Sequence, residues 1–400
     1  MATSTLNAAC HVGADLYQSP RLPADHRYQV VALVLQGGGA LGSYQAGVYQ
    51  GLAEADLHPN WVAGISIGAL NAAIIAGNPP ERRVERLQEF WQTICQPPFL
   101  PPSPLSQMDS VRSWPTPLIG LFNGWEAWRA LIEGQNGFFV PRTPFNTDGP
   151  AGPGNASYYD TAPLKSTLEA LVDFDRLNDT REMRVSVGAV NVKTGNFIYF
   201  DNTKEPLRAE HFMASGALPP GFPAVEIDGE YYWDGGVVSN TPLQQVLATT
   251  PRKNSLVFQV DLWSSHGSLP TDLSKVALRQ KDIQYSSRTR MITTYMANMQ
   301  KHRRLLRELM QLVPEDVRKD NPWYRRAAEE ACDRLFNVIH LIYKEKDCEG
   351  SYKDYQFGAL TMREHWASGL ADIEHSLAHP EWLDMPPAET PFITHDVHRF

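Results

Sequence analysis

The stretch VVALVLQGGGALG, residues 30–42, decides the fold. Its first six residues form an unbroken apolar run, which is typical of a strand buried on both faces of a parallel sheet. Glycines follow, and residues 40–55 then have a helical pattern. A second strand at 61–65 and an apolar helix at 67–76 repeat the unit. The sequence therefore predicts an α/β fold with a mainly parallel central sheet flanked by helices.

Composition and charge narrow the class of protein. The 400 residues include 45 acidic and 36 basic side chains, for a formal net charge of -9. A mildly acidic surface keeps a protein soluble without attracting nucleic acid, which argues against a nucleic-acid-binding protein. The four cysteines are too scattered for a zinc site or a disulfide framework, so we expect a reducing compartment. They are Cys10, Cys95, Cys332 and Cys348.

The N-terminal residues lack the basic region and the apolar core of a secretion signal. The longest apolar stretch, residues 61–77, is short for a membrane span and contains a serine, an asparagine and glycines. We therefore expect a cytoplasmic protein whose contact with membranes, if any, is peripheral. No cofactor, metal ion or nucleic acid is expected as a partner, and the sequence leaves the oligomeric state open.

Glycines dominate the loop between the first strand and the first helix, at Gly37, Gly38, Gly39 and Gly42. Such a loop aims several backbone N–H groups at one point, beside the positive end of a helix, and binds anionic oxygen. The oxygen belongs either to a dinucleotide pyrophosphate, since the spacing also fits GxGxxG, or to the oxyanion of an acyl-transfer intermediate.

The second strand ends in the motif GxSxG, at Gly64, Ser66 and Gly68. A dinucleotide-binding fold requires an acidic residue at that point, whereas a hydrolase requires a serine on a sharp strand-to-helix turn. Ser66 therefore favours the hydrolase, and a nucleotide-binding oxidoreductase becomes the less favoured alternative.

An aspartate followed by two glycines occurs at Asp234, Gly235 and Gly236. By itself this pattern indicates only a tight turn. Here ASGALPPGFP precedes it at residues 214–223, and an N-x-P segment follows from Asn240.

The ordered motifs GGGxxG, GxSxG, ASxAxPxxFP and DGG resemble those of the patatin-like phospholipases over about residues 28–265. The resemblance implies a three-layer patatin-like fold and a lipid acyl hydrolase with a Ser-Asp dyad. Ser66 would be acylated, Asp234 would be its base, and the backbone of Gly37, Gly38 and Gly39 would form the oxyanion hole. The glycines implied to support these motifs are Gly42, Gly64, Gly68, Gly235 and Gly236. The chain departs from many family members at Leu41, where an arginine or lysine is common.

Three regions follow from these motifs: an N-terminal extension (1–27), a hydrolase domain (28–265) and a mostly helical C-terminal region (266–400). A run rich in proline and aromatic residues, at about 96–157, is predicted to be an insertion in the hydrolase domain. Residues 336–344 have strand-like composition, and we expect this strand to dock on the main sheet.

Six aromatic residues of the insertion are candidates for the wall of an acyl channel. They are Trp114, Phe122, Trp125, Trp128, Phe138 and Phe139.

The long helix predicted at 273–313 is basic. Residues 279–307 contain eight lysines and arginines against one aspartate, with apolar residues at near-helical spacing from Ile292 to Leu309. Such a helix either lies on an anionic membrane through Arg303, Arg304 and Arg307, or packs its apolar stripe on the core.

Alternatives to lipid hydrolysis are an esterase acting on short or hydroxyalkanoate esters with the same site, and a catalytically silent membrane-binding scaffold. The identity of the base also has an alternative, because Ser66, Asp234 and His266 match the chain order of a Ser-Asp-His triad. A carboxylate base predicts activity well below about pH 6, whereas an imidazole, with its reference pKa of about 6.5, predicts loss of activity there.

Overall fold

The computed structural model describes residues 16–98, 114–142, 152–346, 349–350 and 352–397. These residues form a nine-stranded sheet in the order β11-β10-β9-β1-β2-β5-β8-β7, with β6 also paired to β5. Strands from β11 to β5 run parallel, and β6, β7 and β8 complete the sheet in antiparallel pairs. The predicted mainly parallel α/β fold is confirmed. The strands are β1 (Val30–Leu35), β2 (Trp61–Ile65), β5 (Arg184–Asn191), β6 (Phe197–Asp201), β7 (Val225–Ile227), β8 (Glu230–Asp234), β9 (Ser255–Asp261), β10 (Phe336–Ile342) and β11 (Phe392–Asp396).

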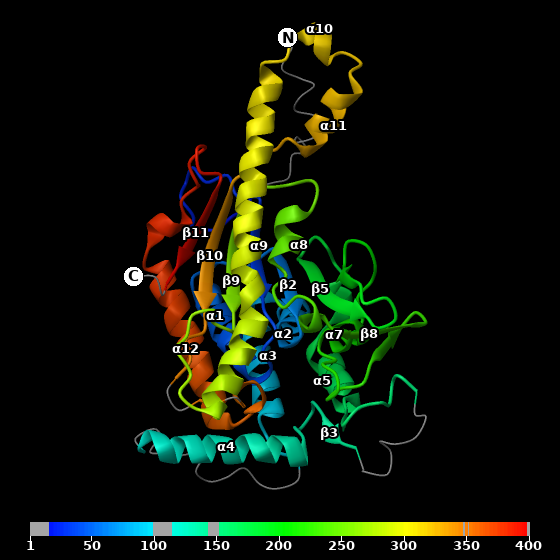
Figure 1. Cartoon of the computed structure of the whole chain (residues 1–400), viewed down its shortest axis with the longest axis vertical. Coiled ribbons are helices and arrows are strands. Elements are labelled where there is room, and N and C mark those ends of the chain that lie inside the picture. The colour runs from blue at the N-terminus through cyan, green and yellow to red at the C-terminus, as the bar shows by residue number, and fades with distance from the viewer. Residues whose placement is uncertain (1–15, 99–113, 143–151, 347–348, 351, 398–400) are drawn as a thin grey trace.

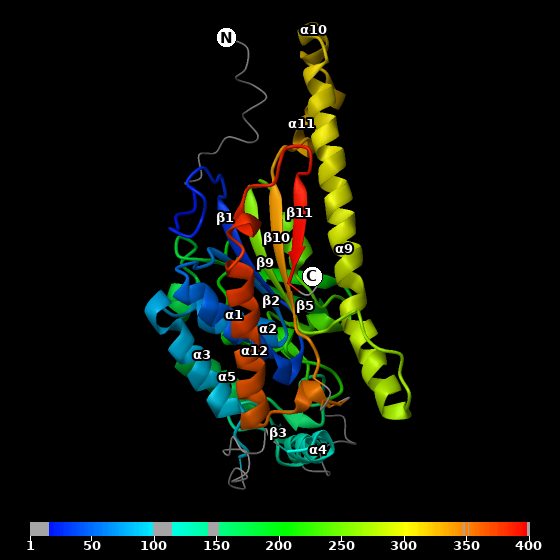
Figure 2. The same ribbon diagram turned by 90° about the vertical axis from the view of Figure 1, so that its left-hand side faces the viewer.

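Helices cover both faces of the sheet and make three layers (Figure 2). Alternate residues of β1 point to opposite faces, as the pleat requires. Leu33 lies in one core with α1, α2, α3 and α12, and Val34 lies in the other with α8 and α9. The bounds of these helices are α1 (Ser43–Glu54), α2 (Ile67–Ala76), α3 (Pro80–Ile94), α8 (Leu243–Ala248), α9 (Leu273–Gln311) and α12 (Ala359–Leu377).

Shorter elements complete the described chain. A two-stranded sheet pairs β3 (Val140–Pro141) with β4 (Tyr159–Asp160). The remaining α-helices are α4 (Thr116–Glu133), α5 (Ala162–Leu171), α6 (Phe174–Leu177), α7 (Ala209–Ser215), α10 (Glu315–Arg318) and α11 (Pro322–Glu330). Single 3₁₀ turns are η1 (Gly39–Gly42), η5 (Gly235–Val237), η6 (Lys353–Tyr355) and η7 (Pro380–Leu383). Parts of the predicted insertion, residues 99–113 and 143–151, lie outside the described residues.

The C-terminal region is built into the main sheet. Strand β10 pairs in parallel with β9 and, on its other side, with β11. The predicted docking of this strand is confirmed. Asn337 on β10 donates its side-chain amide to the hydroxyl of Tyr28 and to the carbonyl oxygen of Trp382, at 3.0 and 2.7 Å. Residues far apart in the sequence are therefore joined by hydrogen bonds beside the start of β10.

Helix α9 crosses one face of the sheet and projects beyond it toward α10 and α11 (Figure 1). Met296 and Ile292 pack into the core, as the core-packing alternative predicts, but Tyr295 and Leu309 are exposed, so the predicted apolar stripe is wrong at these two positions. None of the helices in the described part of the chain combines the length and the apolar character that a bilayer-spanning segment requires.

Two arginines of α9 form ion pairs within the protein. Arg303 pairs with Glu330 at 3.8 Å, and Arg307 pairs with Asp333 at 3.3 Å. Their charges are thus partly balanced by the last residue of α11 and by an aspartate that follows it. The role of these arginines at a membrane stays a prediction.

We expect a chain ending at residue 265 not to fold into a soluble monomer. The truncation removes β10 and exposes the edge of β9, a strand buried along its whole length, and an unpaired apolar edge promotes aggregation. Size-exclusion chromatography and circular dichroism would measure this against the full chain. A monomeric truncated protein with native helix content would contradict it.

Candidate active site

Ser66 lies between β2 and α2 on a strained turn. Its φ of 56° is in the left-handed region, which a residue other than glycine rarely adopts. The Ser66 N–H donates to the Ser215 hydroxyl at 2.9 Å, and that hydroxyl donates to the Gly188 carbonyl at 2.7 Å. Ser215 therefore fixes the strained backbone. The sequence motif at residues 214–223 contains this serine but does not reveal its role.

The two glycines of the GxSxG motif permit this turn. A Cβ atom at Gly64 would overlap the carbonyl oxygen of Gly68, and one at Gly68 would overlap that of Leu35. Strand β2, helix α2 and the end of β1 thus approach so closely that no side chain fits at either position. The result is a serine presented at the N-terminus of α2, where negative charge is stabilised.

Asp234 ends β8 and is 1% exposed. Its carboxylate accepts a hydrogen bond from the Gly236 N–H at 2.7 Å, and the Ser66 side chain lies close enough to favour its charged form. Burial raises the pKa of Asp234 from 3.8 to about 7, because removal from water penalises the charged form more than the Ser66 side chain and the Gly236 N–H favour it. The structure thus brings the two predicted residues close together.

The glycine loop lies against Ser66, and its backbone is clamped at Gly37. The Gly37 carbonyl accepts from the side chains of Asn240 and Trp263, both at 2.9 Å, and its N–H donates to the Asn240 carbonyl at 3.3 Å. Among the described residues, no acceptor is found for the N–H groups of Gly38 and Gly39. Of the three predicted donors, Gly37 is thus already engaged, and the other two are available to a ligand.

Gln36, fully buried just before the loop, was also missed from the sequence. Its side-chain oxygen accepts from the N–H groups of Leu262 and Trp263, at 2.6 and 3.1 Å. Its side-chain nitrogen donates to the Thr241 hydroxyl at 3.0 Å and to the Tyr285 carbonyl at 3.2 Å. One amide therefore joins the end of β1 to the segment after β9, to the loop after η5 and to α9.

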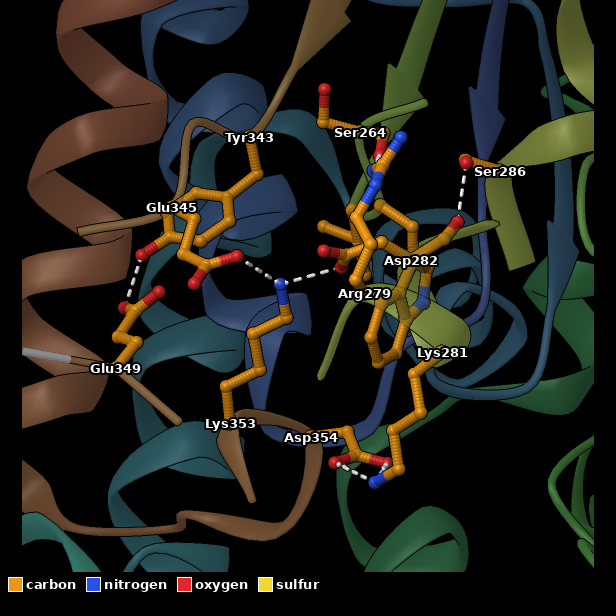
Figure 3. Close-up of polar contacts among 12 residues, drawn as sticks. Ser264, Arg279, Lys281, Asp282, Ser286, Tyr343, Glu345, Glu349, Lys353 and Asp354 are labelled. Atoms are coloured by element: carbon orange, nitrogen blue, oxygen red, sulfur yellow. Dashed lines mark hydrogen bonds and ion pairs between the residues drawn. The ribbon is translucent and has the colours of Figure 1, made fainter. Parts of the chain in front are cut away.

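The turn η6 supports the glycine loop from the C-terminal region. A Cβ atom at Gly39, whose φ is +57°, would overlap the carbonyl oxygen of Asp354. Figure 3 shows the neighbouring Lys353 reaching between Asp282 on α9 and Glu345 after β10, at 2.8 and 3.0 Å. Burial alone would lower the pKa of Lys353, but these two carboxylates raise it, so the buried ammonium stays charged.

An apolar cavity of about 270 Å³ opens beside Ser66 and Asp234. The predicted hydrolase domain and the predicted C-terminal region both contribute to its wall, because Tyr285, Tyr355 and Phe357 come from the C-terminal region. Phe357 contacts Phe138 with ring centroids 5.8 Å apart. The cavity is suited to a hydrocarbon chain, since most of its wall is aromatic or aliphatic.

The structure brings only part of the remaining predictions to this site. Phe138 and Phe139 line the cavity as predicted, but Trp125 and Trp128 lie on the outer surface, so the prediction for these two tryptophans is wrong. His266 is exposed and borders a separate polar cavity of about 840 Å³. Among the described residues, no histidine lines the cavity that contains Ser66.

The three-layer fold and the serine on its strand-to-helix turn define the class, a three-layer α/β protein with a strained serine beside an apolar cavity. A family model described as patatin-like phospholipase matches residues 33–247, more than half of the chain, and the chain belongs to that family. Membership implies an ester-hydrolysing enzyme. A second model, described as patatin phospholipase, matches residues 283–389. The family resemblance predicted from the motifs is confirmed.

Solved structures provide more distant comparisons. VipD from Legionella pneumophila is 16% identical with a TM-score of 0.35, and the match covers 85% of this chain and 67% of that one. Human GIVD cytosolic phospholipase A2 is 12% identical with a TM-score of 0.38, covering 94% of this chain and 62% of that one. The chain therefore spans 62% to 67% of the lengths of these proteins. No curated protein matches the sequence.

Asp234→Asn is expected to stabilise the fold at pH 8 and to do so much less at pH 5. With its folded-state pKa raised to about 7 from 3.8, Asp234 binds a proton more tightly in the folded protein, so wild-type stability falls as the pH rises between these values. The asparagine has no charge to bury and keeps an acceptor for Gly236. The gain at pH 8 should be on the order of a few kcal/mol. Urea unfolding of both proteins at the two pH values measures it, and an equal difference at both would contradict it.

Proposed function

We propose that the protein is a serine lipid acyl hydrolase that uses Ser66 as nucleophile, Asp234 as its base and the glycine loop as oxyanion hole. The observation that carries this proposal is the position of Ser66, which lies on a strained turn beside the buried Asp234 carboxylate and lines the same apolar cavity. Family membership supports the reaction class, and the aromatic wall supports an acyl chain as the group bound there.

The reaction proceeds in two halves. The Ser66 oxygen attacks the ester carbonyl carbon as its proton passes to Asp234, and the carbonyl oxygen becomes an oxyanion. Gly38 and Gly39 donate their N–H groups to that oxyanion, and the N-terminus of α2 adds its partial positive charge. When the tetrahedral intermediate collapses, the alcohol leaves with the proton from Asp234. Water then attacks the acylated serine, gives its proton to Asp234, and releases the fatty acid as Ser66 regains a proton.

Burial prepares Asp234 for this role. A general base works best when its pKa is close to the operating pH, and burial raises the pKa of Asp234 to about 7. This raised pKa argues against the expectation of activity well below about pH 6, which was drawn from the ordinary pKa of a carboxylate. We instead expect activity to fall as the pH drops through about 7, because the protonated carboxyl cannot accept the serine proton. A carboxylate in this environment titrates where a histidine does.

Because an aspartate and a histidine base now predict similar pH profiles, substitutions have to distinguish Asp234 from His266. We expect a fluorophosphonate probe to label the wild type at Ser66, and Ser66→Ala to abolish both labelling and ester hydrolysis. Asp234→Asn should reduce turnover about as strongly, by roughly 1,000-fold or more, because no base remains. His266→Ala is the matched control and should keep most of the activity. Loss of activity in a folded His266→Ala variant to the level of Ser66→Ala would refute the dyad.

Gly38→Val tests the oxyanion hole. The added side chain would overlap Leu262 and displace the N–H donor, and loss of one such donor costs about 3 kcal/mol in the transition state, or about 100-fold in kcat. Because the ester substrate itself carries little charge there, KM should change less. Gly154→Val is the control, since that exposed glycine has nothing nearer than 3.9 Å. A folded Gly38→Val enzyme with unchanged kcat would refute the role of this loop.

A further inference from the structure

Helix α4 turns its apolar face outward. Five large apolar side chains recur at a spacing of three or four residues, which places them on one face of the helix, and all five are exposed. Leu121 is 72% exposed and Trp125 is 53% exposed. Trp125 stacks on Trp128 with ring centroids 5.1 Å apart. The members of this outer face are Leu118, Leu121, Trp125, Trp128 and Ile132.

The charged residues of the same helix turn inward. Arg129 is 7% exposed, donates to both oxygens of Glu133 at 3.0 and 3.1 Å, and lies 3.9 Å from Glu126. A surface helix in water normally has the opposite arrangement, with charges outside and apolar residues against the core. Contiguous exposed apolar residues of this kind mark a surface that binds a protein, a membrane or a ligand.

The position of α4 connects this outer face to the cavity. The helix lies across the lower end of the molecule in Figure 1, beneath the sheet. Leu131, near its C-terminal end, is exposed and lines the cavity beside Ser66, as does Leu218 on another segment. The Tyr159 hydroxyl donates to the Leu131 carbonyl at 2.8 Å, and the Tyr352 hydroxyl donates to the Gly120 carbonyl at 3.0 Å. The helix is thus fixed to the body at both ends.

We propose that the outer face of α4 docks the protein on the surface of a lipid bilayer, so that the cavity receives an acyl chain directly from the membrane. The proposal rests on the function proposed above, because a bilayer is where lipid esters are presented. Tryptophan and leucine on one face of a helix insert at the boundary between headgroups and acyl chains. The occupant has to be apolar rather than anionic, since the only basic residue of α4 is buried and paired within the helix.

The continuity between outer face and cavity favours a bilayer over a second copy of the chain. A protein partner on this face would lie beside Leu131 and Leu218, at the route by which a lipid chain reaches Ser66. A bilayer there supplies the substrate. Because insertion is apolar, vesicle binding is insensitive to salt, unlike the electrostatic attachment that the sequence suggested for α9.

The test measures binding without catalysis. Ser66→Ala protein is floated with vesicles of phosphatidylcholine, which carry no net charge, at low and high salt. We expect binding at both, and an about 100-fold weaker partition coefficient when Leu121→Glu and Trp125→Glu are added, because two inserted side chains are lost. The matched control adds Leu312→Glu and Trp323→Glu, which are 79% and 72% exposed in the wild type but lie at the far end of α9 and on α11. It should bind like the parent.

The same substitutions in the active protein separate the two proposals. We expect hydrolysis of a soluble p-nitrophenyl ester to be retained, and hydrolysis of vesicle phospholipid to fall with binding. Active enzyme that does not bind phosphatidylcholine vesicles would overturn the docking proposal and leave the hydrolase intact. Vesicle binding by a protein that cleaves no ester would overturn only the hydrolase. Light scattering that shows a dimer broken by the α4 substitutions, without vesicle binding, would assign the outer face to a second copy.

Discussion

The buried amide of Gln36 makes four hydrogen bonds, and the geometry around Ser66 depends on them. A buried polar side chain is stable only when its donors and acceptors are satisfied. Here the partners come from the segment after β9, the loop after η5 and α9, so satisfying the amide brings these segments together at the end of β1. Asn240 and Trp263 then clamp the next residue, Gly37. With that carbonyl fixed, the N–H groups of Gly38 and Gly39 keep one direction.

The C-terminal region also helps to hold the glycine loop in place. Two family models describe separate parts of the chain, yet β10 lies inside one continuous sheet, and η6 packs on the glycine loop. Lys353 holds η6 between Asp282 and Glu345, and its ammonium lies 5.1 Å from the ring of Trp263, the residue that clamps Gly37. The C-terminal region therefore forms part of the wall of the cavity beside Ser66, and we do not expect the protein to tolerate its removal.

Stability is lowered locally where the proposed chemistry occurs. Ser66 keeps an unfavourable backbone conformation, and Asp234 is buried at a cost that raises its pKa to about 7. The strained Ser66 and the buried Asp234 are two departures from ordinary protein structure. The outer face of α4 is a third, because its tryptophans are exposed while Arg129 is buried. Each departure breaks a rule that the rest of the fold obeys, which is the pattern expected of functional positions.

The sequence by itself determined the early strands, the order of the motifs and the family. The apolar run of β1 and the glycines around Ser66 are local signals, and local periodicity and turn chemistry suffice to interpret them. Only the tertiary structure decided how Gln36 and Ser215 act, since their partners lie on other segments. The raised pKa of Asp234 likewise depends on burial, which no local pattern records. The apolar spacing of α4 was visible in the sequence, but which face meets solvent depends on what packs against the helix, and that is a property of the whole chain.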